Sequence, residues 1–177
     1  MKKLLSILLL IFLISSGCDK ISKLTQFNLE YDETVVIPAT LGANIPFNVQ
    51  TPDIETNSES SFSVNDTRKD LIESIKLTQM TMAVSTPSDG TFSFLKSIEV
   101  YISADSLDEI EVAWKDNIPN TVGNTLDLET TDSDLKDYIK KNNFNLKVTT
   151  VTDELISSDY TIDIHSVFFV DAKILGF

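Results

Sequence analysis

Apolar and polar residues alternate with a period of two along most of the chain. This alternation predicts strands that bury one face and expose the other. The segments in which it is clearest are residues 27–32, 45–50, 70–85, 97–103, 109–114, 125–129, 143–152 and 160–170. The last segment becomes apolar on both faces at residues 167–170, as expected of a central strand or of a strand that is covered on both sides.

One segment has helical spacing instead. Leu135, Tyr138 and Ile139 lie at i, i+3 and i+4, which marks one face of a helix. We therefore predict one short helix over about residues 132–142.

Two further segments predict connections. Residues 51–68 are polar and acidic and predict a long surface loop. The PSDG sequence at residues 87–90 predicts a turn in which Gly90 adopts a positive φ, so the strands on either side should pair as a hairpin.

About seven to nine strands, one helix and regularly spaced turns predict a mainly β protein. The expected fold is an antiparallel β-sandwich of immunoglobulin-like type, and a closed β-barrel is the alternative. A chain of 177 residues is long enough to form one domain with its own core.

The first residues have the layout of a secretory signal peptide. Lys2 and Lys3 precede an apolar run over residues 4–14, and small residues at 15–17 precede Cys18, the only cysteine. The apolar run is about half of the ~20 residues that a membrane-spanning helix needs, so it is too short to span a bilayer.

The residues before Cys18 resemble the lipobox of bacterial lipoproteins. Ser16 and Gly17 match the small residues of that motif, whereas Ser15 stands where the family usually has leucine. The resemblance implies that Cys18 is the site of lipid attachment and carries palmitate-like acyl chains. It also implies that residues 1–17 are a lipoprotein signal peptide. Residues 18–26 have mixed charge and no sustained periodicity, which predicts a tether, and the alternating segments that follow predict a single β-sandwich domain (27–177).

The chain is strongly acidic. Its formal net charge of −13 becomes −15 when the leader with Lys2 and Lys3 is removed. Nucleic-acid binding depends on clustered Lys and Arg, so we expect none here. Arg68 is the only arginine, and acylation of Cys18 would leave no thiol for a disulfide, a metal site or a nucleophile.

Candidate catalytic groups are few. His165 is the only histidine and shares a strand face with Asp163, but no serine lies in a Gly-x-Ser-x-Gly elbow. We interpret His165 as a solvent-facing strand residue. We expect no catalytic residue, no cofactor and no enzyme activity.

Acidic and aromatic side chains gather in the segment 109–114. Glu109 and Glu111 share a strand face close to Trp114, and Tyr101 lies on the preceding predicted strand. Paired carboxylates serve glycosidases, and aromatic rings often accompany sugar sites. With 27 acidic residues such pairs arise by chance. We therefore expect a core tryptophan beside a solvated acidic face, with a carbohydrate-contact surface at Trp114 or Tyr101 as the alternative.

Calcium is the metal that best suits a chain poor in His and Cys. The segment ETTDSDLKD offers Glu129, Asp132, Asp134 and Asp137. It lacks the glycine and the final glutamate of an EF-hand loop, and helix capping already accounts for Asp132 and Asp134. We therefore assign no metal site.

The mature chain resembles the small lipoproteins of Bacteroidetes in the segments NDTRKDLIESIKLTQMTM, FSFLKSIEVYIS and FFVDAKIL. The resemblance implies a β-sandwich on a lipid anchor in the bacterial cell envelope. The expected location is the outer membrane. The domain could face either the periplasm or the cell surface. The DSL sequence also resembles the O-glycosylation motif of that phylum, which would make Ser106 an acceptor.

Two functional hypotheses follow. The first is a non-catalytic lipoprotein that contacts a protein partner or helps an envelope assembly, and it predicts that Trp114 is buried. The second is a glycan-binding accessory lipoprotein, and it predicts exposed aromatic rings.

Overall fold

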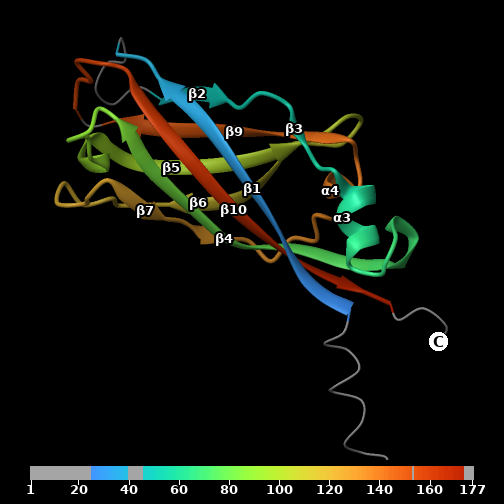
Figure 1. Ribbon diagram of the computed structural model, residues 1–177. Coiled ribbons are helices and arrows are strands. Elements are labelled where there is room, and N and C mark those ends of the chain that lie inside the picture. Colours follow the sequence, from blue (N-terminus) through green and yellow to red (C-terminus); the bar gives the residue numbers. More distant parts are fainter. Residues whose placement is uncertain (1–24, 40–45, 153, 174–177) are drawn as a thin grey trace, which may run out of the picture.

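A computed structural model describes residues 25–39, 46–152 and 154–173. Two antiparallel sheets pack face to face, and their strands cross obliquely (Figure 1). One sheet contains β1 (Gln26–Ile37), β4 (Ile72–Thr86), β7 (Thr125–Asp127) and β10 (Tyr160–Ala172). The other, six-stranded sheet contains β2 (Pro46–Gln50), β3 (Ile54–Glu55), β5 (Leu95–Ser103), β6 (Ile110–Lys115), β8 (Glu129–Thr130) and β9 (Asn143–Thr152). The predicted antiparallel β-sandwich is confirmed, and the closed-barrel alternative is wrong because the sheets stay separate.

The strand order within the sandwich is that of a jelly roll. The first sheet has the order β1-β10-β4-β7, and the second has the order β2-β9-β5-β6-β8, with β3 paired to β9. Neighbouring strands are thus mostly distant in sequence, as in two interleaved Greek keys. Immunoglobulin domains order their strands differently, as ABED and CFG.

The strands on either side of the PSDG sequence do not pair with each other. β4 pairs with β10 and β7, whereas β5 pairs with β6 and β9, so the predicted hairpin is wrong. The connection over residues 87–94, which includes a 3-10 helix (Phe92–Phe94), joins the two sheets. Gly90 is buried there, and a Cβ on it would lie 2.7 Å from Val84 Cγ1. Close packing, rather than a positive φ, therefore requires the glycine.

The predicted helix over residues 132–142 is present but much shorter. It is α4 (Lys136–Ile139). The chain just before α4 is bonded to β4 and is not helical. The Leu135 N–H donates to the Ile75 carbonyl (2.7 Å).

No helix within the described ranges has both the length and the hydropathy needed to cross a membrane.

The segment 51–68 is not a plain loop. It contains β3 and a second helix, α3 (Ser58–Val64), and a 3-10 helix (Lys69–Leu71) follows it. Phe62 is fully buried and packs edge-on against Phe27 of β1, with 6.2 Å between the ring centroids. This one aromatic anchor explains why a polar segment folds against the sandwich.

The inner faces of the two sheets share one apolar core. Near α3, Tyr31 of β1, Phe168 of β10 and Phe144 of β9 meet edge to face, with ring centroids 5.3–6.0 Å apart. Such ring pairs contribute about 0.5–1.5 kcal/mol beyond their buried area. The Tyr31 hydroxyl also donates to the Thr56 carbonyl (3.0 Å), which fixes the chain just before α3.

The predicted leader and most of the predicted tether, with Cys18, lie outside the described residues. Gln26, the last residue assigned to the tether, is the first residue of β1 and pairs with Asp171. The sheet therefore begins one residue earlier than the predicted domain.

Asp134 connects α4 to β4. Its Oδ1 accepts the N–H groups of Ile75 (3.0 Å) and Lys136 (3.1 Å), and its Oδ2 lies 2.9 Å from Lys136 Nζ. Burial raises the pKa of Asp134, but the hydrogen bonds and the Lys136 charge lower that pKa by more, so the net shift is downward.

We expect Asp134→Ala to lower the free energy of unfolding by about 1–2 kcal/mol at neutral pH, because the Ile75 N–H loses its acceptor. The carboxylate stabilises the fold above its unfolded pKa of about 3.9, and this contribution is lost as the pH falls through the lower folded pKa. Denaturant unfolding of wild type and variant should therefore converge in acid. Asp132→Ala is the matched control, because Asp132 is fully exposed and only pairs with Lys76 (3.4 Å). An undiminished difference in acid would contradict the role of the carboxylate.

Candidate functional site

The outer face of the six-stranded sheet carries two aromatic side chains on neighbouring strands. Buried residues alternate with Glu99 and Tyr101 along β5, so both of these face outward. The strand register sets Glu99 opposite Trp114 and Tyr101 opposite Glu111. We call these four residues, Glu99, Tyr101, Glu111 and Trp114, the platform.

A β-bulge in β6 places Trp114 on this face. The register with β5 skips Val112, which is the extra residue. Val112 and Ala113 are both fully buried, so the alternation resumes one residue late and Trp114 turns outward. An uninterrupted alternation would have placed Trp114 in the core, and the expectation of a core tryptophan is therefore wrong.

Trp114 is half-buried and does not belong to the apolar core. Glu99 on one side and Glu129 on the other are its cross-strand neighbours. Among the described residues its indole has no stacked ring, no cation over it and no hydrogen-bond acceptor for its N–H. The indole therefore offers a ring and a donor to a ligand, between two carboxylates.

Tyr101 is held in place by its neighbours. Its hydroxyl donates to Glu99 Oε2 (2.7 Å), and Lys147 Nζ lies 4.8 Å from the ring centroid. The hydrogen bond to Glu99, with smaller effects of burial and of the charges on Glu99, Glu111 and Glu109, raises the pKa of Tyr101 to about 12. Tyr101 therefore stays neutral at physiological pH, and Glu99 stays an acceptor.

The two predicted carboxylates have different surroundings. Glu109 pairs with Lys147, whereas the side chain of Glu111 has no ion pair or hydrogen bond within the described part of the chain. Glu111 is therefore free to accept from a ligand. The sequence did not point to Glu99 or Lys147, because only the register between strands brings them to the aromatic rings.

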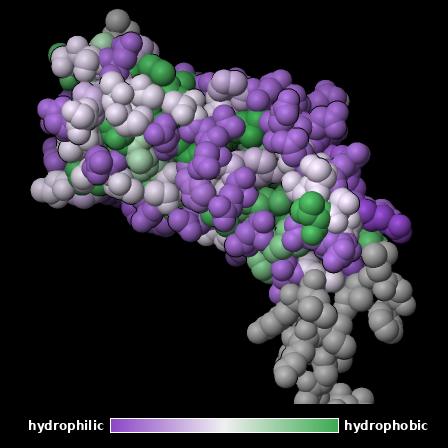
Figure 2. All heavy atoms as spheres, in the orientation of Figure 1, coloured by the Kyte–Doolittle hydropathy of each residue, from purple (hydrophilic) through white to green (hydrophobic). Residues whose placement is uncertain are grey.

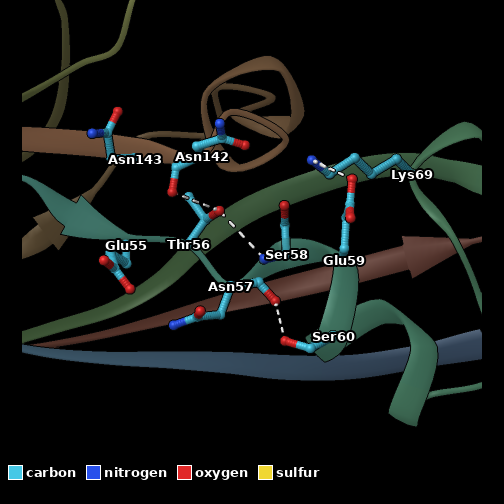
Figure 3. Close-up of a pocket in the computed structure, with 9 residues that line it drawn as sticks. All are labelled: Glu55, Thr56, Asn57, Ser58, Glu59, Ser60, Lys69, Asn142 and Asn143. Carbon is cyan, nitrogen blue, oxygen red and sulfur yellow. Dashed lines mark hydrogen bonds and ion pairs between the residues drawn. The ribbon is translucent and has the colours of Figure 1, made fainter.

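A polar hollow of about 420 Å³ lies where β9 begins, beside the start of α3 (Figure 3). All of its lining residues have polar side chains, and they are Glu55, Thr56, Asn57, Ser58, Glu59, Ser60, Lys69, Asn142 and Asn143. The Thr56 hydroxyl donates to the Lys141 carbonyl (2.6 Å), and Lys69 Nζ lies 3.6 Å from Glu59 Oε1. Asn57, with φ of 47°, forms the corner between β3 and α3.

His165 lies on the outer face of the four-stranded sheet, and its predicted solvent-facing position is confirmed by a side chain that is 37% exposed. Its partner is Asp32 of β1, whose Oδ1 lies 2.7 Å from Nδ1. Asp163 instead accepts from the Thr34 hydroxyl (2.9 Å). The structure therefore pairs His165 with a different acid from the one on its own strand.

The four carboxylates considered for calcium do not converge. Glu129 pairs with Lys115 (3.5 Å), Asp132 pairs with Lys76, and Asp134 binds the start of α4. Asp137 is an exposed residue within α4. Within residues 25–39, 46–152 and 154–173, no three His, Cys, Asp or Glu side chains are arranged to hold a metal ion.

Ser106 lies in the exposed turn between β5 and β6, with φ of 60°. Its hydroxyl is therefore accessible, as an acceptor of a glycan would need to be.

The sequence matches no family model and no curated protein. Among solved structures, the chain is similar to N-glycanase F (PNGase F), with 14% identity, 86% of this chain covered and a TM-score of 0.43. It spans 44% of the N-glycanase F chain. It is also similar to carbohydrate-binding modules of the β-sandwich superfamily (16% identity, 84% and 55% of the two chains, TM-score 0.31) and to a chain of the cyanophage Pam1 capsid (8%, 82% and 86%, TM-score 0.39). At these values the similarity is one of fold.

Trp114 is the only tryptophan, so its fluorescence reports on the platform alone. We expect acrylamide to quench it in the folded protein, because the indole lies outside the core. Each ion is compared with its own quenching of free N-acetyltryptophanamide. Relative to that reference, iodide should be weakened more than caesium, because Glu99 and Glu129 flank the ring and repel anions. The double variant Glu99→Gln, Glu129→Gln should reduce this difference. Equal relative quenching by the two ions in wild type would contradict the acidic surroundings of Trp114.

Proposed function

We propose that the protein is a non-catalytic, glycan-binding lipoprotein of the bacterial cell envelope, and that the platform binds the sugar. The observation that carries this proposal is the outward position of Trp114. An outward indole whose N–H has no acceptor among the described residues suits a ligand with both an apolar face and hydrogen-bonding groups.

Sugars have this combination of properties. The C–H groups on one face of a sugar ring pack against an aromatic ring, while the hydroxyls donate to carboxylates and amides. The Glu111 carboxylate has no partner among the residues that the structure describes, and Glu99 accepts from Tyr101 with one oxygen and has a second oxygen to offer. The platform therefore supplies an apolar surface and acceptors within one pair of strands.

The surface favours a glycan over a protein partner. The large hydrophobic residues that are exposed in the described ranges are Val36, Val64 and Leu155, which lie on β1, on α3 and in the β9–β10 connection. The face seen in Figure 2, on the side of β1, β10 and β4, is mostly hydrophilic, with small and separate hydrophobic areas. Protein interfaces usually have a contiguous apolar centre. The hypothesis of a protein partner also predicted a buried Trp114, and Trp114 lies outside the core.

A glycan array tests the proposal. We expect the full chain in detergent to bind a subset of glycans, and Trp114→Ala to weaken that binding at least about thirty-fold, as for a central aromatic contact. Phe169→Ala is the matched control, because Phe169 is a half-buried aromatic residue on the outer face of the other sheet. A wild-type protein that binds no glycan would remove the proposal, and loss of binding in the Phe169 variant alone would move the site to the other sheet.

We further propose that lipid on Cys18 holds the domain at the membrane. One acyl chain gives only marginal membrane binding, and two or more give stable binding. We expect wild-type protein to partition into the detergent phase and Cys18→Ser to partition into water. Mass spectrometry of the N-terminal peptide should find Cys18 as the first residue, with acyl chains attached. An unmodified thiol in the mature protein would contradict the anchor.

A further inference from the structure

We infer that the platform and the hollow beside α3 are two ends of one binding track, and that this track selects a linear, uncharged glycan of several sugar residues. The inference rests on the proposed function and deepens it, because one end of the track is Trp114. It adds a second contact region and a class of ligand.

The outward face of β9 connects the two ends. Its outward residues, at every second position, are Asn143, Asn145, Lys147, Thr149 and Val151, and the first four span the distance between the two ends. Asn143 also lines the hollow, and Thr149 pairs with Glu99 in the row that contains Trp114. Six residues of strand separate Asn143 from Thr149, so the two ends lie about 20 Å apart. This is several times the width of a sugar ring, so a chain of sugars would be needed to contact both.

The middle of the track is polar and ordered. The side-chain amides of Asn143 and Asn145 both donate to the Asp53 carboxylate, at 3.0 and 2.7 Å. These bonds fix the two amides and leave their oxygens as acceptors for hydroxyl groups. The ligand would therefore find acceptors between the platform and the hollow.

The hollow is also lined by a serine. Ser58 is only 3% exposed, and its N–H donates to the Thr56 hydroxyl (3.3 Å). Figure 3 shows its side chain between those of Thr56 and Glu59. A serine hydroxyl can both donate and accept, so this position suits a ligand group that forms hydrogen bonds.

Two free amides border the same space. The side chains of Asn57 and Asn142 have no hydrogen-bond partner in the described part of the protein, and each offers a donor and an acceptor. Together with Ser58 they form a neutral set of groups suited to hydroxyls. The hollow of about 420 Å³ is also within the usual range of ligand sites.

The charge of the track excludes acidic sugars. Asp53, Glu99 and Glu111 lie along it, while Lys69 and Lys147 are already paired with Glu59 and Glu109. No lysine is thus left to bind a sugar carboxylate or sulfate among the residues that form the track. Like-charge repulsion would discriminate against uronic-acid and sulfated chains.

The experiment uses an array with ladders of neutral gluco-, manno- and xylo-oligosaccharides, from disaccharide to hexasaccharide, and a matching uronic-acid ladder. The proteins are wild type, Trp114→Ala and a hollow variant, Asn57→Gly with Asn142→Ala. Glycine at position 57 keeps the positive φ while removing the amide. Asn120→Ala, an exposed asparagine between β6 and β7, is the matched control.

We expect wild type to bind a neutral ladder more tightly as the chain lengthens, and not to bind the uronic-acid ladder. The affinity of the hollow variant for the longest oligosaccharides should fall about tenfold, as expected for one or two lost hydrogen bonds. Its affinity for the disaccharides should equal that of wild type. If the hollow variant binds every rung as wild type does while Trp114→Ala abolishes binding, the track is overturned and the proposed function stands. If wild type binds no rung, both are overturned, and binding of the uronic-acid ladder would overturn the selection by charge.

Discussion

Pairing between β5 and β6 slips by one residue at Val112, and the surface chemistry of the six-stranded sheet depends on this slip. Side chains alternate strictly along a strand, so a single extra residue reverses the face of every residue that follows. Glu111 before the bulge and Trp114 after it are an odd number of residues apart and nevertheless face the same side. Without the extra residue the acidic groups and the indole would lie on opposite faces, and no platform would form.

The jelly-roll connectivity assembles the rest of the surface. One row across the six-stranded sheet contains Asn48, Thr149, Glu99, Trp114 and Glu129, each from a different strand. The Thr149 hydroxyl donates to the Asn48 side chain (2.8 Å), which continues the polar row to β2. These residues are distant in sequence, so the surface exists only once both Greek keys have closed.

The sequence was sufficient for most of the strands and for the fold class, but it missed β3 and merged β7 with β8. The alternation of Phe144, Leu146 and Val148 predicted β9 with its correct bounds, because burial of one face requires apolar residues at every second position. The pairing partners of a strand cannot be read from such a pattern. The expected hairpin after β4 is wrong because the connection through Gly90 joins two sheets. The helix over residues 132–142 was overestimated, because an amphipathic spacing does not reveal that Leu135 bonds to β4.

The candidate site was predicted only in part. The sequence identified Trp114, Tyr101 and Glu111 as candidate residues, but a bulge has no signature in one sequence, so the tryptophan was assigned to the core. The hollow lay in a segment that was predicted to be a loop. Its serine and asparagine residues are ordinary loop residues in sequence, and only the anchor at Phe62 brings them against β9.

The contact between Phe27 and Phe62 also affects how a lipid-anchored domain would be oriented relative to the membrane. It holds α3, and with it the hollow, against the first residues of β1, and only seven residues of chain separate Cys18 from Gln26. A lipid at Cys18 would thus keep the hollow proximal to the bilayer and leave Trp114 at the distal end. A glycan bound along β9 would then extend away from the membrane, with its far end open to longer polymers.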